Sequence, residues 1–343
     1  MIKTKRVYAP GEVLKVGKRW AIGVDLGGTK VEIAQVNGSG RLLERLRRPT
    51  LVQGGPEGVR EEIVAAVKNL RDKAASPPVG VGVGLAAQID PEQGMVHFAP
   101  NLGWRNVPFQ EDLGKALGLP VVVTNDVRAA TWGEWLHGAG RGCDDLVCLF
   151  VGTGIGAGVV SGGRMVSGCS NTAGEVGHMT IDLHGPSCTC GGRGCFEALA
   201  GGWAMARDAR EAVSADPSPG ASLLKLAGGR PEAITAEMVS LAAKEGDPLA
   251  RRLIDSVVQA LIAGCVSVVN AFNPCRLVLG GGVMEGSPEL VERIDRGVRQ
   301  RALSAATQLL QILPAQLKGD AGVIGAAVLA MQRFVRKEEF RDV

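Results

Sequence analysis

The stretch GEVGHMTIDLHGPSCTCGGRGCFE, residues 174–197, concentrates metal-binding side chains in a glycine-rich segment. One histidine and three cysteines follow the spacing H-x9-C-x-C-x4-C: His178, Cys188, Cys190 and Cys195. Three thiolates and one imidazole complete a tetrahedral zinc site and leave no position open for a reactive water. The spacing therefore predicts a structural zinc rather than a hydrolytic one, with His184 as a competing nitrogen ligand.

Two carboxylates, Glu175 and Glu197, flank these metal ligands. A histidine that binds zinc through one ring nitrogen keeps the other nitrogen for a hydrogen bond that points outward. Glu175 lies three residues before His178 and could share a substrate with that outer nitrogen. A solvated turn explains Glu175 alone, but it explains the whole group poorly.

Three glycine-rich turns each follow an apolar run that reads as a strand: DLGGTK (25–30), GTGIG (152–156) and LGGGV (279–283). Backbone N–H groups that glycine leaves accessible can bind phosphate, and Thr29 and Lys30 add donors. The sequence has no Walker A motif, and no G-x-G-x-x-G follows the first strand. Each turn alone is a weak signal, and a tight hairpin turn explains GTGIG in isolation. The three together are what a split nucleotide site between two domains would need.

Asn125 and Asp126 end the apolar run PVVVTND. A carboxylate at the carboxyl end of a buried strand faces the crevice in which α/β sheets bind ligands, but Asp is also a favoured helix N-cap. Asn101, in PNLGW, has a similar alternative as a turn residue. Together with a phosphate site, the carboxylate suggests phosphoryl transfer, in which it accepts the proton of an attacking hydroxyl while Mg²⁺ neutralises phosphoryl oxygens.

Strands and helices alternate along the chain, which predicts the α/β class with two sheets. Strands are expected at 20–26, 31–37, 41–48, 79–85, 120–126 and 276–282, and a hairpin at 146–163. Helices are expected at 57–75, 110–118, 128–137, 196–214, 235–245, 247–271, 287–305 and 322–336. The strand–turn–strand units that begin near residues 20 and 146 resemble each other, which suggests two related halves facing a cleft.

The composition is that of a soluble globular protein, with 343 residues, 45% of them hydrophobic, and a formal net charge of +3. Such a small charge gives no reason to expect nucleic-acid binding. The first residues, MIKTKRVYAP, lack the apolar core of a signal peptide, and we identify no apolar run of the ~20 residues that a membrane span needs. We therefore expect a cytoplasmic protein without a membrane partner, in which a cysteine cluster favours a metal over disulfides.

Several motifs occur together and in order: DLGGTK, VGTGIGAGVV, AGEVGHM, CTCGGRGCFE, LGGGV and GDAGVIGAA. With them the chain resembles the ROK family (repressor, open reading frame, kinase) over nearly its whole length, and within it the bacterial glucokinases. The resemblance implies an actin-like, hexokinase-type (ribonuclease H-like) α/β fold, with two domains around a cleft, and ATP-dependent phosphorylation of a sugar hydroxyl. It implies a small domain of residues 1–123 and 320–343 and a large domain of residues 124–319 that carries the zinc loop.

The resemblance also implies roles for individual residues. Asp126 matches the catalytic base, and the sugar contacts match Asn101, Asn125, Asp126, Glu175, His178 and Glu197. The nucleotide-binding residues match Asp25, Gly27, Gly28, Thr29, Lys30, Gly152, Thr153, Gly154, Gly156, Gly280, Gly281 and Gly282. The zinc ligands match His178, Cys188, Cys190 and Cys195, which selects His178 over His184. The implied cofactors are ATP, Mg²⁺ and a structural Zn²⁺.

One departure concerns the sugar, because Ala86-Ala87 replaces the Pro-Gly that many family members carry in a loop touching it. We expect glucose, and leave N-acetylmannosamine, N-acetylglucosamine, mannose and fructose open, as well as polyphosphate in place of ATP. A sugar-responsive transcriptional repressor is the alternative from another class. Only about 19 residues precede the first strand, too few for a helix-turn-helix module. The family implies a homodimer or homotetramer.

Overall fold

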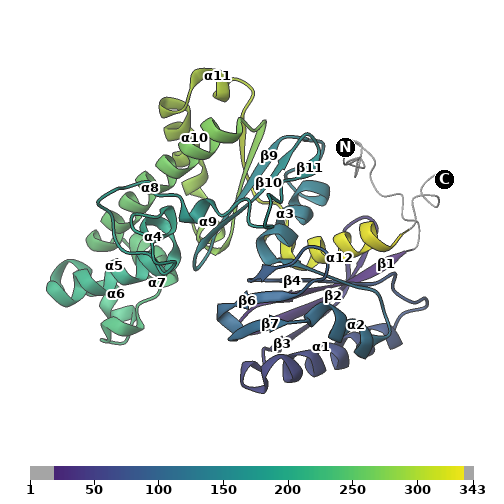
Figure 1. Cartoon of the computed structure of the whole chain (residues 1–343). Coiled ribbons are helices and arrows are strands. Elements are labelled where there is room, and N and C mark those ends of the chain that lie inside the picture. Colours follow the sequence, from purple (N-terminus) through teal and green to yellow (C-terminus); the bar gives the residue numbers. More distant parts are fainter. Residues whose placement is uncertain (1–18, 336–343) are drawn as a thin grey trace. The chain divides into compact units, whose positions relative to one another are not determined.

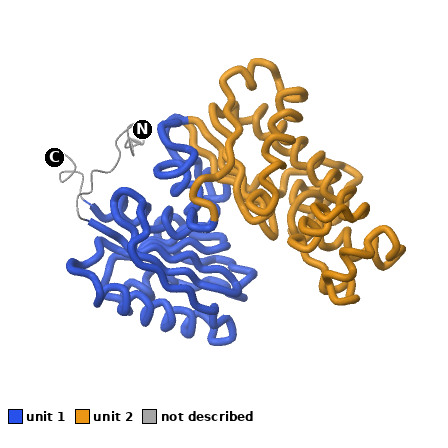
Figure 2. The backbone as a smooth tube through the Cα atoms, turned by 180° about the vertical axis from the view of Figure 1, so that it is seen from behind, with its two compact units in different colours: residues 1–144, 162–173, 319–343 blue, residues 145–161, 174–318 orange. Residues whose placement is uncertain are grey.

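The computed structural model describes residues 19–335, which form two compact units (Figures 1 and 2). Among these residues, unit 1 comprises 19–144, 162–173 and 319–335, and unit 2 comprises 145–161 and 174–318. The expected first boundary, at residue 124, falls instead after residue 144, because helix α3 (Asp126–His137) packs against α12 (Ala321–Phe334) and strand β4 (Val81–Leu85). The N-terminal residues used to argue against a DNA-binding module, 1–18, lie outside the described residues.

Unit 1 is built on a five-stranded sheet with the order β3-β2-β1-β4-β8. β1 pairs antiparallel with β2 and parallel with β4, and β8 continues the parallel half. Its other strands are β1 (Trp20–Leu26), β2 (Lys30–Asn37), β3 (Leu42–Pro49) and β8 (Val121–Asn125). A small antiparallel sheet comprises β5 (Gln88–Ile89), β6 (Val96–Ala99) and β7 (Trp104–Val107).

Helices cover both faces of the larger sheet in unit 1 (Figure 1). α12 and α3 lie on one face, and α1 (Gly55–Asp72) and α2 (Phe109–Leu117) lie on the other. A strand covered on both faces needs apolar side chains in both directions, and β1 and β4 are accordingly buried almost throughout. The covering helices therefore fix where the polar residues that follow these strands emerge.

Unit 2 has a second five-stranded sheet, ordered β11-β10-β9-β12-β13. β9 pairs antiparallel with β10 and parallel with β12, which pairs parallel with β13, so the strand order and directions of unit 1 recur. The strands are β9 (Leu146–Val151), β10 (Ile155–Ser161), β11 (Arg164–Met165), β12 (Arg276–Gly280) and β13 (Gln311–Pro314). This repetition confirms the two related halves, although β11 belongs to a segment that packs with unit 1.

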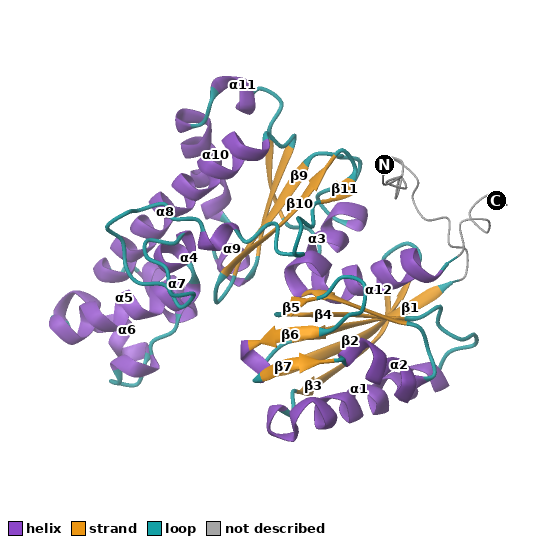
Figure 3. Ribbon diagram, in the orientation of Figure 1, coloured by secondary structure: helices purple, strands orange, loops and turns teal. Residues whose placement is uncertain are grey.

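Helices make up most of the rest of unit 2 (Figure 3). They are α4 (Phe196–Ala200), α5 (Gly202–Ala215), α6 (Ala221–Leu226), α7 (Ala236–Glu245), α8 (Pro248–Phe272), α9 (Gly282–Gly286), α10 (Glu289–Arg301) and α11 (Ser304–Thr307). The single helix expected at 196–214 is thus two helices, because Gly201 has an extended backbone that ends α4 and precedes α5.

Helix α8 corrects the expectation that no segment is long and apolar enough to cross a membrane. By length and composition this helix meets that condition, and half of its most apolar window is buried inside the protein. It contacts α4, α5, α7 and α10, which is the packing of a core helix. Its apolar composition is therefore explained by the core of unit 2.

Candidate functional site

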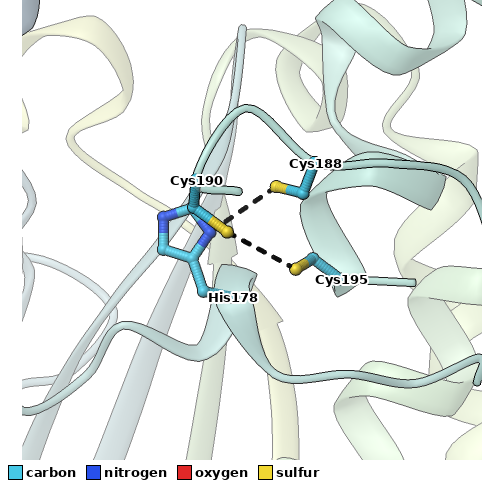
Figure 4. Close-up of side chains that lie close together, drawn as sticks. All are labelled: His178, Cys188, Cys190 and Cys195. Atoms are coloured by element: carbon cyan, nitrogen blue, oxygen red, sulfur yellow. Dashed lines mark hydrogen bonds between the residues drawn. The ribbon is translucent and has the colours of Figure 1, made fainter. Parts of the chain in front are cut away.

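Four metal-binding side chains of unit 2 converge, as Figure 4 shows: His178, Cys188, Cys190 and Cys195. Their ligand atoms all lie within 4.8 Å of one another. The Sγ atoms of Cys190 and Cys195 are 3.7 Å apart, and Sγ of Cys188 is 3.9 Å from Nδ1 of His178. Sulfur and nitrogen ligands about 2.0–2.3 Å from zinc, at tetrahedral angles, are about 3.5–3.8 Å apart. The group therefore fits zinc, and within the described residues it contains His178 rather than His184.

Hydrogen bonds of the loop backbone hold the thiols in place. The N–H of Cys188 donates to the carbonyl of Gly192 (2.9 Å), and the N–H of Gly192 donates to Sγ of Cys190 (3.4 Å). Gly194 has a φ of 65°, and a Cβ there would clash with the carbonyl of Asp182. Cys195 is the N-cap of α4, so a metal ligand fixes the start of the helix that carries Glu197.

The thiols differ in how easily they ionise. Burial, with the neighbouring thiols Cys188 and Cys190, raises the pKa of Cys195 to about 12. The backbone N–H of Gly192 lowers the pKa of Cys190. Since metals bind thiolates, a metal would have to displace the proton of Cys195, and affinity would fall with falling pH.

His178 ends a short 3-10 helix, Val176–His178, and Glu175 is its N-cap. Nδ1 of His178 faces the thiols, so Nε2 is the nitrogen left for another partner. Both side chains are exposed. This agrees with the prediction that one nitrogen binds the metal and the other is available to a ligand beside Glu175.

Glu197 is bound through both carboxylate oxygens. Oε2 accepts from the backbone N–H of Ile155 (2.8 Å), and Oε1 accepts from Nε1 of Trp203 (3.1 Å). A Cβ on Gly154 would clash with Oε2, so glycine allows this close approach. Glu197 therefore contacts the second glycine turn directly, a contact that the sequence did not indicate.

The start of α5 also supports that turn. The N–H of Gly202 donates to the carbonyl of Gly152, and the N–H of Trp203 donates to the carbonyl of Thr153, both at 2.9 Å. With these carbonyls engaged, the turn has a defined shape. A Cβ on Gly152 would meet open space, so the turn presents an uncovered backbone to a ligand.

The third glycine turn lies beside the second within unit 2. Gly280 pairs with Phe150 at the end of β9, and Gly281 follows with a φ of 89°. A Cβ on Gly281 would lie 2.5 Å from the carbonyl of Val151, the residue before the second turn. Gly282 opens α9, and a Cβ there would meet nothing within 4 Å.

The sequence left two roles open for Asp126, that of a carboxylate facing a ligand and that of a helix N-cap, and the structure of unit 1 at the end of β8 distinguishes them. Asn125 is the N-cap of α3, and its Oδ1 accepts from the N–H of Arg128 (3.2 Å). Asp126 is the first residue of the helix, and its Oδ1 accepts from the N–H of Val127 (2.9 Å). Since the neighbouring residue supplies the cap, capping does not account for a half-buried carboxylate at Asp126.

Asp25 is a second carboxylate at the same edge of the unit 1 sheet. Burial, then the charges of Asp126 and Glu32, raise its pKa to about 6, and Lys30 opposes this. A Cβ on Gly322, near the start of α12, would lie 2.8 Å from Oδ2 of Asp25. A buried carboxylate with acidic neighbours is stabilised by a cation, so the residues present fit Mg²⁺ at Asp25.

The first glycine turn joins β1 to β2 beside these carboxylates. Its carbonyls are held by Thr50, whose hydroxyl donates to Gly27 (2.7 Å) and whose N–H donates to Thr29 (3.0 Å). A Cβ on Gly28 would lie 3.0 Å from the carbonyl of Asn101, so this turn and Asn101 are neighbours. Neither Gly27 nor Gly28 is among the positive-φ glycines, so close approach, not a left-handed backbone, explains glycine here.

The predicted residues thus form two groups, one in each unit. Unit 1 brings together the first turn, Asn101, Asn125, Asp25 and Asp126. Unit 2 brings together the second and third turns, the metal cluster and Glu197. Thr50 and Trp203 were missed, because their contacts are made with residues distant in sequence and no local pattern marks them.

The family model described as the ROK family matches residues 21–333. A glucokinase of Thermotoga maritima is 36% identical over 313 residues, which cover 91% of this chain and 97% of the relative. An N-acetylmannosamine kinase of Salmonella typhimurium is 31% identical over 315 residues, covering 90% of this chain and 97% of the relative.

A solved structure supports the fold assignment. The crystal structure of a ROK family glucokinase from Streptomyces griseus, in complex with glucose and AMPPNP, has a TM-score of 0.80 and 36% identity. The match covers 91% of this chain and 99% of that chain. The actin-like, hexokinase-type α/β fold is therefore confirmed.

Proposed function

Because the chain belongs to the ROK family, we propose that it is an ATP-dependent sugar kinase that converts glucose to glucose 6-phosphate. The observation that carries this proposal is the pair of strand-end carboxylates in unit 1. Asp126 is not the helix cap, and Asp25 beside it has a pKa raised by burial. One carboxylate suits proton transfer and the other suits a cation.

In the proposed reaction, the sugar hydroxyl oxygen attacks the γ-phosphorus of ATP. The O–P bond forms, the bond from the γ-phosphorus to the β–γ bridging oxygen breaks, ADP leaves, and the hydroxyl proton passes to Asp126. A free hydroxyl has a far higher pKa than a carboxylic acid, so the proton moves late, as the new bond forms. Mg²⁺, held through Asp25, would neutralise charge on the phosphoryl oxygens.

Backbone groups of the three glycine turns would bind the nucleotide. We propose that the first and second turns bind phosphates and that the third turn contacts the adenosine side. The backbone of the second turn is held by Glu197, which accepts the N–H of Ile155, and by the start of α5, which donates to the carbonyls of Gly152 and Thr153. Donors on a backbone fixed in this way stabilise developing charge without reorganising during the reaction.

The sugar contacts are proposed to be Asn101, Asn125, Asp126, Glu175, His178 and Glu197. Zinc at the Cys3His cluster would have a structural role, because its four protein ligands leave no position for substrate. It would hold His178 with Nε2 outward and keep the start of α4, hence Glu197, in place. We further propose a cytoplasmic homodimer or homotetramer that acts at the entry to glycolysis.

The N-acetylmannosamine kinase relative makes an N-acetyl hexose the second candidate substrate. A transcriptional repressor is disfavoured, because a repressor needs neither the base Asp126 nor three phosphate turns. The test is a panel of glucose, mannose, fructose, N-acetylglucosamine and N-acetylmannosamine with MgATP, and kcat/KM for each. Glucose should give the highest value; a preference for an N-acetyl sugar would overturn the glucose assignment, and polyphosphate replacing ATP would overturn the donor.

A further inference from the structure

Trp203 contacts three parts of the site in unit 2: Glu197, the second glycine turn and the cysteine cluster. Its indole Nε1 donates to Oε1 of Glu197 (3.1 Å). Its backbone N–H donates to the carbonyl of Thr153 in the second turn (2.9 Å). Its half-buried ring packs against the apolar cluster of Cys188, Cys195 and Ala198.

The contact with Glu197 decides how that carboxylate is oriented. With Oε1 bound to the indole, Oε2 is directed to the N–H of Ile155. A carboxylate that loses one of two fixed donors gains freedom to rotate, and its bond to the turn weakens. Hydrogen bonds to a charged acceptor are among the stronger ones in proteins, so the orientation is well determined.

Arg207 also contacts the ring. The guanidinium of Arg207 lies 5.1 Å from the centre of the Trp203 ring and donates to the carbonyl of Ala198 (3.1 Å). Together with the cluster of Cys188 and Cys195, this leaves the indole little freedom. A rigid indole can transmit the position of the metal ligands to the glycine turn.

We propose that Trp203 is a positioning residue that connects the Cys3His cluster to the second glycine turn through Glu197. Metal binding fixes Cys195 and the start of α4, and the indole orients Glu197. Glu197 takes up the N–H of Ile155 and so fixes the backbone of residues 152–156, whose remaining N–H groups would meet a phosphate. The proposal rests on the nucleotide role given to this turn above. It makes zinc a determinant of nucleotide affinity as well as of sugar affinity.

The test is the variant Trp203→Phe, which keeps an aromatic ring on the cysteine cluster but removes the indole donor. The measured quantities are zinc content and the dissociation constant of MgADP, determined by titration without sugar. We expect zinc to stay at about one ion per chain and nucleotide affinity to fall about five- to tenfold, which is the effect of losing one typical protein hydrogen bond. The matched control is Trp20→Phe, which removes the indole donor to the carbonyl of Ser76 in unit 1 and should leave MgADP affinity unchanged.

A double-mutant cycle tests whether Trp203→Phe lowers MgADP affinity through Glu197 or by another route. In the Glu197→Gln background, Trp203→Phe should change MgADP affinity less than twofold. Full additivity would overturn the proposal, as would an unchanged affinity or a loss of zinc in Trp203→Phe alone. If the native chain itself fails to bind MgADP, the proposed kinase function is wrong, and this outcome is distinguishable from a failure of the Trp203 proposal alone.

A measurement on the native chain does not depend on the variant folding. After zinc is chelated, as verified by elemental analysis, amide hydrogen exchange in residues 152–156 should accelerate relative to strand β12. Unchanged exchange in that turn would contradict the connection between cluster and turn.

Discussion

Replacing Asp25 by Asn should make the metal-free protein more stable at neutral pH while abolishing its activity. The pKa of Asp25 is raised from 3.8 to about 6, chiefly by burial. At pH 7 the folded protein therefore holds a carboxylate that would be protonated more easily than in the unfolded chain. The shift of about two units corresponds to about 3 kcal/mol, at 1.36 kcal/mol per unit.

The direction in which stability changes with pH follows from proton binding at Asp25. Between about pH 4 and 6 the folded state binds more protons at Asp25 than the unfolded state, so the free energy of unfolding falls as pH rises through this window. Asp25→Asn removes the titration. The variant and the native chain should differ little below pH 4, and the variant should be the more stable one above pH 6 by up to about 3 kcal/mol.

The assay is thermal or urea unfolding from pH 4 to 8, without nucleotide, with and without Mg²⁺. A gain of 1 kcal/mol shifts the midpoint of a unit of this size by about 2–4 °C. Mg²⁺ should stabilise the native chain and not the variant. Asp90→Asn is a control for which the expected change in stability has the opposite sign. Backbone N–H groups of Gln93 and Glu92 lower the pKa of Asp90, so its carboxylate is favoured in the folded state. That variant should lose stability at neutral pH, and the loss should disappear on acidification.

The reasoning would be refuted by an Asp25→Asn variant with the same pH dependence as the native chain. It would also be refuted if the variant were less stable at pH 7. Either result would mean that the Asp25 carboxylate is favoured, not penalised, by its surroundings.

Other variants probe the remaining groups. Asp126→Asn should lower kcat by at least about a hundredfold with sugar binding retained, as measured by initial rates and titration; near-normal kcat would remove the base assignment. Cys190→Ser should lose zinc and sugar affinity, measured by elemental analysis and KM, and a native chain without zinc would contradict the metal site. Gly281→Ala should reduce the unfolding midpoint by several degrees, because its φ of 89° and the carbonyl of Val151 both oppose a side chain.

The parts of the fold with strong local signals were predictable from the sequence. The central strands are nearly continuous apolar runs ended by glycine or acidic residues. Helix α8 ends at Phe272, one residue beyond the expected end, and its C-cap Asn273 has a left-handed backbone with a φ of 45°. Strands β5, β6, β7, β11 and β13 were missed because each has four residues or fewer. β13 also contains a proline and lies at the edge of its sheet, where that residue is tolerated.

The candidate site was predictable where its residues are adjacent in sequence. The spacing of the cysteines identified a cluster that the structure brings within 4.8 Å. The contacts of Glu197 with Ile155 and Trp203 were not predictable, because they depend on where α5 and the second turn lie in the folded unit. The raised pKa of Asp25 was not predictable either, because it arises chiefly from burial in the folded unit and then from the charges of Asp126 on α3 and Glu32 on β2.

The repeated strand order explains why each unit carries functional residues at one edge. In both sheets the first strand of the unit pairs parallel with later strands, so their carboxyl ends meet. In unit 1 the residues at that edge are Asp25 and Asp126, an acidic pair that attracts a cation. In unit 2 they are the glycines of the second and third turns, which offer N–H donors to anions. On the proposed function, the same topology would supply acid–base and metal chemistry in one unit and phosphate recognition in the other, which are the two requirements of phosphoryl transfer.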